Sequence, residues 1–123
     1  MEDLIIEKGA NTPAITFMAN GVLKIEGRSI PENPAAFYEK AFEWLNDYKT
    51  TNPKKIELHV DLEYFNSSSS IILMNIFKTL RGILNHGADV RIHWHNSAND
   101  EEMIESGRYY ESILKMPFFY EMN

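Results

Sequence analysis

Four consecutive serines, Ser67 to Ser70, are the residues of this chain whose types and spacing best suit a chemical role. They follow Asn66 and lie between an alternating apolar and polar run, Lys55 to Glu63, and an almost wholly apolar run that begins at Ile71. The alternating run predicts a strand and the apolar run predicts a helix, so the serines fall at a helix N-terminus. The first N–H groups of a helix lack partners and the helix dipole is positive there, which favours a phosphate group. The pattern therefore suggests a serine phosphorylation switch.

A simpler interpretation is that these residues only cap the helix. Asn and Ser are both favoured at the N-cap, where one side-chain oxygen accepts a hydrogen bond from a free N–H group. One cap needs one side chain, however, so capping leaves the other hydroxyl groups without a role. The residues alone leave both interpretations open.

A second candidate site consists of His93 and His95, which are two residues apart in a predicted strand and so point to the same face of it. Together with Asp100 or Glu101 they could bind zinc or iron, although no further ligand motif is present. We therefore expect a structural or surface role for them, with no bound metal and no cofactor. The alternative function is a small-ligand or metal-binding enzyme domain whose pocket brings Ser67 together with His93 and His95.

The chain lacks the motifs of most catalytic classes. It contains no cysteine, which excludes disulfides, cysteine-based zinc sites and thiol catalysis. It has no glycine-rich phosphate loop and no Gly-x-Ser-x-Gly nucleophile elbow, and nothing local arranges a Ser-His-Asp triad. We expect a protein that is not an enzyme and that has no catalytic residues.

Length and charge indicate a single acidic domain. The chain has 123 residues, of which 44% are hydrophobic, which suffices for one core over residues 1–123. Its formal net charge is −6 and it has no basic tract, so nucleic acid and anionic membrane surfaces are poor partners. No apolar run approaches the ~20 residues that span a bilayer, and the acidic start at Met1 to Leu4 lacks the features of a signal peptide. We expect a cytoplasmic protein.

The elements that must position these residues alternate after an N-terminal hairpin. Asn20-Gly21 between two apolar runs is a strong hairpin signal, and Asn33-Pro34 suits the start of a helix. Gly27 to Pro34 is predicted to be a loop, and Phe118 to Tyr120 an aromatic tail that docks on the body. The expected elements are a strand at Leu4–Ile6, a hairpin over Ala14–Glu26, a helix from Asn33 to about Thr50, a strand over Lys55–Glu63, a helix over Ser68–His86, a strand over Val90–His95 and a helix that Asn99 caps and Met116-Pro117 ends.

This order, β-β-β-α-β-α-β-α, predicts an α/β fold with a mixed β-sheet, an N-terminal hairpin and helices packed on the sheet. The serine helix is unusual, because six of the seven residues from Ile71 to Phe77 are apolar. Some of these side chains either point outward as a partner surface, with Met74 as an adaptable contact, or are covered by neighbouring helices. Arg28, before the first helix, is either a surface charge or a docking residue for an acidic group of a partner.

The position of the serine cluster, between a strand and the second helix, resembles the STAS fold of anti-anti-sigma factors. The chain is more similar still to the SiaC-like family of bacterial regulatory phosphoproteins, which have a STAS-like fold. Each of the segments that carry the resemblance is weakly specific alone, whereas their ordered set is fairly specific. These segments are Gly27 to Asn33 (Gly-Arg-Ser-Ile-Pro-Glu-Asn), Trp44-Leu45, Tyr64 to Ser69 (Tyr-Phe-Asn-Ser-Ser-Ser) and Asp100 to Gly107 (Asp-Glu-Glu-Met-Ile-Glu-Ser-Gly).

The resemblance implies a single STAS-like regulatory domain with a partner-switching role. A serine/threonine protein kinase phosphorylates a hydroxyl in the turn, a PP2C-type phosphatase removes the phosphate, and the unmodified form activates a downstream effector such as a diguanylate cyclase. The family motif places the acceptor on Ser67, which we favour, whereas the anti-anti-sigma pattern places it on Ser68. The partner-binding residues that we expect around the turn are Arg28, Asn66, Ser69, Ile71 and Met74.

Overall fold

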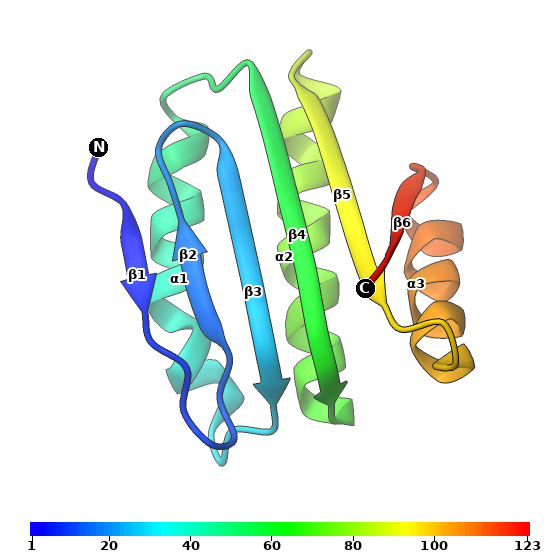
Figure 1. The fold of residues 1–123 in the computed structure, drawn as a ribbon. Coiled ribbons are helices and arrows are strands. Elements are labelled where there is room, and N and C mark those ends of the chain that lie inside the picture. Colours follow the sequence, from blue (N-terminus) through cyan, green and yellow to red (C-terminus); the bar gives the residue numbers. More distant parts are fainter.

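Six strands form one sheet in which the spatial order follows the chain order, β1-β2-β3-β4-β5-β6. The computed structural model describes residues 1–123, and three helices complete the fold (Figure 1). The elements are β1 (Leu4–Ile6), β2 (Ala14–Phe17), β3 (Val22–Ser29), α1 (Pro34–Lys49), β4 (Lys55–Phe65), α2 (Ser67–Asn85), β5 (Asp89–Asn96), α3 (Glu101–Leu114) and β6 (Phe118–Met122).

The directions of the strands explain where the helices lie. β1, β2 and β3 form an antiparallel meander, and β3, β4, β5 and β6 pair in parallel. Each parallel connection contains one helix, and each step moves toward the same edge of the sheet. Because such crossovers are almost always right-handed, the helices pack on one face of the sheet and leave the other face uncovered, as Figure 1 shows.

The core is a single layer between the sheet and the helices. Each helix buries one apolar stripe, and α2 lies in the middle, in contact with both α1 and α3. The central strands alternate between buried apolar residues that face the helices and polar residues on the uncovered face. In β4 the buried residues are Ile56, Leu58, Val60 and Leu62. None of the helices combines the length and apolar character needed to cross a lipid bilayer.

The predicted α/β fold and the hairpin at Asn20-Gly21 are confirmed, whereas the loop predicted to begin at Gly27 is wrong. Gly27, Arg28 and Ser29 are instead the last residues of β3 and pair with β4. The register shifts between Gly27 and Arg28, and Gly27 has φ of 122°, a conformation that glycine adopts readily. This irregularity lets the strand continue where the glycine was expected to end it.

Of two further predictions near the C-terminus, the cap at Asn99 is wrong, whereas the docking of the aromatic tail is confirmed, although the tail is a strand. Asp100, and not Asn99, caps α3, because its side-chain oxygen accepts a hydrogen bond from the N–H of Met103 at 3.0 Å. The predicted aromatic tail is the edge strand β6, which pairs in parallel with β5 from Phe118 to Met122. The tail therefore docks through its backbone as well as its side chains.

Gly107 lies in the middle of α3, where it touches the ring of Trp94. A Cβ atom at this position would lie 2.8 Å from Trp94 Cδ1, and Trp94 is fully buried. We expect Gly107→Ala to lower the free energy of unfolding by about 1–3 kcal/mol, because the overpacking outweighs the ~1 kcal/mol by which alanine is favoured over glycine in a helix. Urea unfolding followed by circular dichroism measures this change.

Gly82 in α2 provides the matched control, because a Cβ atom there meets no other atom within 4 Å. Gly82→Ala should raise the free energy of unfolding by up to ~1 kcal/mol. An equal stabilisation by both substitutions would show that α3 does not pack against Trp94 as closely as the structure describes.

Candidate functional site

The turn between β4 and α2 is closed by Asn66, which caps the helix. The Asn66 side-chain oxygen accepts a hydrogen bond from the N–H of Ser69 at 2.9 Å, and the Asn66 backbone oxygen accepts one from the N–H of Ser70 at 2.9 Å. Asn66 therefore fills the capping role by itself, and capping does not explain the four serine hydroxyls.

Ser69 joins the start of α2 to β3 and α1. Its hydroxyl donates to the backbone oxygen of Ser29 at 2.9 Å and accepts from the Ser29 hydroxyl at 2.8 Å. The Ser29 hydroxyl has one hydrogen, which it donates to Ser69. Ser29 Oγ must therefore accept from the Tyr38 hydroxyl, which lies 2.6 Å away. Burial raises the pKa of Tyr38 to about 12, which keeps the phenol protonated as the donor.

Ser69 has no exposed surface, so the structure gives it this internal role in place of the partner contact predicted from the sequence. Ser69 lies four residues before Leu73 and seven before Ile76, both of which are buried in the core. That spacing puts it on the buried face of the helix, a signal that the sequence contained.

Ser70 joins the start of α2 to α3. The hydroxyl of Tyr110 donates to the backbone oxygen of Ser70 at 3.0 Å, which leaves Ser70 Oγ to donate to Tyr110 Oη at 2.9 Å. Burial raises the pKa of Tyr110, so this phenol also stays protonated. The two serines at the end of the cluster are thus engaged with neighbouring elements.

Ser67 and Ser68 differ from the other two serines, because both are exposed and neither hydroxyl forms a hydrogen bond within the protein. They are the first two residues of α2, where backbone N–H groups have no acceptor within the helix and the dipole is positive. The expected exposed turn at a helix N-terminus is confirmed for these two residues. The cluster divides into two serines that hold the turn and two that are free.

The end of the molecule that contains the free serines also has a cation and exposed apolar side chains. Arg28 is exposed at the end of β3, where it pairs in register with Tyr64 of β4 and has no carboxylate within ion-pair distance. Tyr64 is 51% exposed and Ile71 is 65% exposed. Met74 is only partly exposed and packs against the core.

The expectation of an outward-facing apolar helix holds only in part. Leu73, Ile76 and Phe77 are buried, because α2 lies between the other two helices. Ile71, in the first turns of α2 beside the serines, is the apolar side chain that points to solvent. On α2, an apolar partner surface is therefore confined to the end that begins at Ser67.

Two surface pockets lie at opposite ends of α2. The one at the serine end has a volume of about 350 Å³ and is acidic and aromatic, with walls formed by Phe65, Ser70, Glu102, Glu105, Ser106, Tyr109 and Tyr110. The larger one, of about 580 Å³, includes Gly82 and His86 and so lies roughly 20 Å along the helix from Ser67. The larger pocket is therefore distant from the serine turn, and the smaller pocket is the one that adjoins it.

The predicted histidine site has different members in the structure. His95 Nε2 lies 2.9 Å from His59 Nδ1, and His93 Nδ1 donates to Glu121 Oε1 at 2.6 Å. Neither Ser67, on the helix side of the sheet, nor Asp100, which caps α3, contacts these histidines. The pocket expected for an enzyme, with Ser67 beside His93 and His95, is not formed.

Sequence reasoning missed His59, Glu57 and Glu121 as neighbours of these histidines. The register that pairs His59 with His93 brings β4 and β5 together, and β6 places Glu121 beside His95. Burial, followed by the nearby charges of His93 and His95, lowers the pKa of His59. The hydrogen bond from His93 lowers the pKa of Glu121, which favours its ionised form.

Comparison with known proteins gives this geometry a family context. The model of the SiaC family of regulatory phosphoproteins matches residues 6–122. The structure is similar to that of apo-SiaC from Pseudomonas aeruginosa, with a TM-score of 0.91 and 27% identity over 98% of this chain and 99% of that one. An uncharacterized protein of Pseudomonas aeruginosa (strain UCBPP-PA14) is 29% identical over 119 residues, which are 96% of this chain and 94% of that protein.

A further similar structure shows a relative in a complex. A chain in the crystal structure of the Pseudomonas aeruginosa diguanylate cyclase SiaD in complex with its activator SiaC matches with a TM-score of 0.92 and 27% identity, over 98% of this chain and 100% of that one. The family model covers nearly the whole chain, so the resemblance drawn from the four sequence segments is confirmed. This chain belongs to the SiaC family of regulatory phosphoproteins.

Proposed function

We propose that the protein is a non-catalytic partner-switching regulator that acts in the cytoplasm. A serine/threonine kinase phosphorylates Ser67, or failing that Ser68, and a PP2C-type phosphatase removes the phosphate. The unmodified form binds and activates an effector such as a diguanylate cyclase, and the phosphorylated form does not. The observation that carries the proposal is the division of the serine cluster, in a family of regulatory phosphoproteins, into two engaged and two free hydroxyls.

A phosphate on either free serine is compatible with the fold. The hydroxyls of Ser67 and Ser68 are exposed and support no hydrogen bond, so their modification breaks no contact. The unpartnered N–H groups and positive dipole of the first turn favour a group that carries about −1.5 to −2 charges. The phosphorylated protein should therefore keep its structure.

The same phosphate is poorly compatible with docking at this end of the molecule. The proposed docking surface consists of Arg28, Asn66, Ile71 and Met74, around the free serines. A phosphate beside exposed apolar Ile71 would have to be desolvated when a partner covers it. It would also add to the negative charge of Glu102 and Glu105 in the adjacent pocket, and could draw Arg28 away from an acidic group of the partner.

The choice of a diguanylate cyclase as effector rests on the relative whose structure is known in a complex. SiaC of Pseudomonas aeruginosa is the activator of the cyclase SiaD. The similarity extends over 98% of the present chain, so the end of the molecule that contains the serine turn is included in it. We carry the effector class, and not its identity, over to this protein.

Mapping of the phosphate on protein isolated from its native host tests the proposal. We expect intact-mass measurement and peptide mapping to find one phosphate, on Ser67 or Ser68, that a PP2C-type phosphatase removes. The engaged serines, Ser69 and Ser70, serve as internal controls and should stay unmodified. Phosphate on either of those two, or a protein that binds and releases its effector without any modification, would overturn it.

A further inference from the structure

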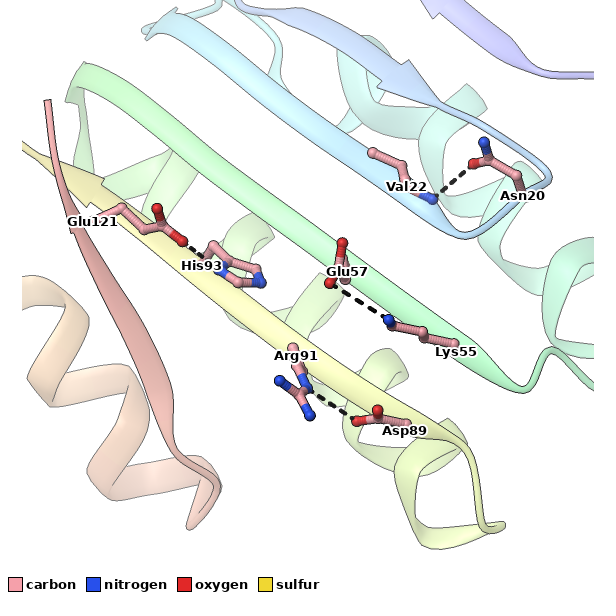
Figure 2. Close-up of polar contacts among 8 residues, drawn as sticks. All are labelled: Asn20, Val22, Lys55, Glu57, Asp89, Arg91, His93 and Glu121. Atoms are coloured by element: carbon pink, nitrogen blue, oxygen red, sulfur yellow. Dashed lines mark hydrogen bonds and ion pairs between the residues drawn. The ribbon is translucent and has the colours of Figure 1, made fainter.

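The uncovered face of the sheet contains a cluster of imidazoles and carboxylates that the proposed switch does not use. Glu57 and His59 lie on β4, His93 on β5 and Glu121 on β6, all on the side away from the helices; Figure 2 shows Glu57, His93 and Glu121. One possible ligand atom from each of Glu57, His59 and His93 lies within 4.8 Å of the others. These atoms come from adjacent, paired strands, so the backbone holds them together.

The hydrogen bond to Glu121 fixes which nitrogen of His93 is free. An ionised carboxylate only accepts, so the hydrogen of neutral His93 lies on Nδ1 and points to Glu121 Oε1, 2.6 Å away. His93 Nε2 then presents a lone pair. This atom is buried and has no hydrogen-bond partner, although the surrounding face is polar. A buried acceptor without a donor is rare in folded proteins and calls for an explanation.

A longer chain of hydrogen bonds fixes His59 in the same way. The Asn123 amide donates to Asp61 Oδ1 at 2.9 Å, so its oxygen accepts from His95 Nδ1 at 3.1 Å. His95 Nε2 must then accept from His59 Nδ1, at 2.9 Å, if both rings are neutral. His59 Nε2 is left as a second lone pair.

We propose that Glu57, His59 and His93 form a binding site for a divalent metal ion of the zinc type. The site offers two imidazole lone pairs and a carboxylate, and Lys55 Nζ is 4.0 Å from Glu57 Oε1, beyond hydrogen-bond distance. Two histidines and one glutamate are a known zinc donor set, which leaves a fourth position for water or a partner's group. His95 takes no part in coordination, because both of its nitrogens are engaged.

The surroundings of the three ligands resemble those of metal sites. A histidine that binds a metal usually donates its other N–H to a carboxylate or another acceptor, as His93 does to Glu121 and His59 does to His95. Burial lowers the pKa of His59, which favours the neutral ring that a metal requires. The His59 and His93 ring centroids lie 4.5 Å apart, so the two side chains must move closer to reach the ~3.4 Å ligand spacing of tetrahedral zinc.

Titration calorimetry with zinc chloride on the untagged full chain, stripped with a chelator, tests the proposal. We expect one equivalent of Zn²⁺ to bind, and His93→Gln or Glu57→Gln to weaken binding at least ~100-fold. Glu121→Gln, which removes only the outer carboxylate, should weaken it about 10–100-fold. His86→Gln is the matched control and should change nothing, because His86 is an exposed histidine at the far end of α2.

Thermal melts with and without Zn²⁺ provide a second measurement. A site that binds only the folded protein raises the melting temperature as zinc concentration increases. The wild-type protein and His86→Gln should show this shift, and Glu57→Gln should need at least ~100-fold more zinc for an equal shift. The proposal is overturned if wild-type protein shows no saturable binding, or if His86→Gln loses as much affinity as His93→Gln.

Discussion

Phosphate on Ser67 is expected to lower the affinity of the protein for its effector at least ~30-fold without unfolding it. Loss of one good interface contact costs ~2 kcal/mol, which corresponds to that factor. A doubly charged group must be desolvated or repelled when a partner covers the exposed surface around Ile71, so its cost should be no smaller. The Ser67 hydroxyl forms no hydrogen bond within the protein, so its phosphorylation should not destabilise the fold.

The measurement compares effector affinity for unmodified protein, enzymatically phosphorylated protein and two variants. Ser67→Ala should bind like the unmodified protein, because Asn66 caps α2 whatever residue follows it. Ser67→Asp carries one charge where phosphate carries up to about two, so it should weaken binding less than phosphate does. Equal affinity in all four states, with thermal melts showing that each is folded, would leave the free serines without a regulatory role.

Arg28 offers a control that separates loss of the Arg28 contact from the other costs of the phosphate. It is exposed at the end of β3 and pairs with no carboxylate in the free protein. If Arg28 contacts an acidic group of the effector, Arg28→Gln should weaken binding of the unmodified protein, and phosphorylation should then cost less than it does in the wild type. An unchanged phosphate effect in Arg28→Gln would assign the loss of binding to desolvation at Ile71 and to the negative charge added beside Glu102 and Glu105.

The turn itself could be predicted from the sequence, because its signals are local. Asn66 followed by serines and an apolar run identifies a helix N-terminus from neighbouring residues alone. The division of the serines was also accessible, since Ser69 has the helical spacing of buried Leu73 and Ile76. The sequence could not identify the hydrogen-bond partners of Ser69 and Ser70. These partners are Ser29 and Tyr110, and each lies 40 residues along the chain from its serine.

The histidine cluster shows more clearly what the sequence alone cannot predict. The alternation around His93 placed it on one face of a strand, which the structure confirms. Its neighbours depend on the register between β4 and β5, and a shift of one residue would turn His59 to the other face. The hydrogen bond from His93 to Glu121 depends on β6, whose first three residues are all aromatic and show no alternation in the sequence. Local periodicity predicts which face of a strand a residue occupies, whereas its neighbours on the next strand are known only once the sheet is assembled.

Ser69→Asp is expected to lower the free energy of unfolding by about 3–5 kcal/mol, the range in which a buried unpaired charge falls. Ser69 has no exposed surface, and its hydroxyl both donates to Ser29 O and accepts from Ser29 Oγ. A carboxylate cannot donate to the backbone oxygen, so the substitution buries a charge opposite a carbonyl dipole. Ser69→Ala should cost less, about 1–3 kcal/mol, because it leaves the Ser29 hydroxyl without an acceptor but adds no charge, and the Ser29 backbone oxygen still accepts from the N–H of Asn66.

Ser68→Asp is the matched variant one residue away, and it should unfold at the same or a slightly higher urea concentration than wild type. Its side chain is exposed in the first turn of α2, where a negative charge is worth about 0.3–1 kcal/mol of stabilisation. If Ser69→Asp and Ser68→Asp unfold together, Ser69 is open to solvent and becomes a third candidate acceptor. If they separate as expected, the fold itself restricts the kinase to the first two serines, because a phosphate on the third cannot coexist with the contacts among α1, α2 and β3.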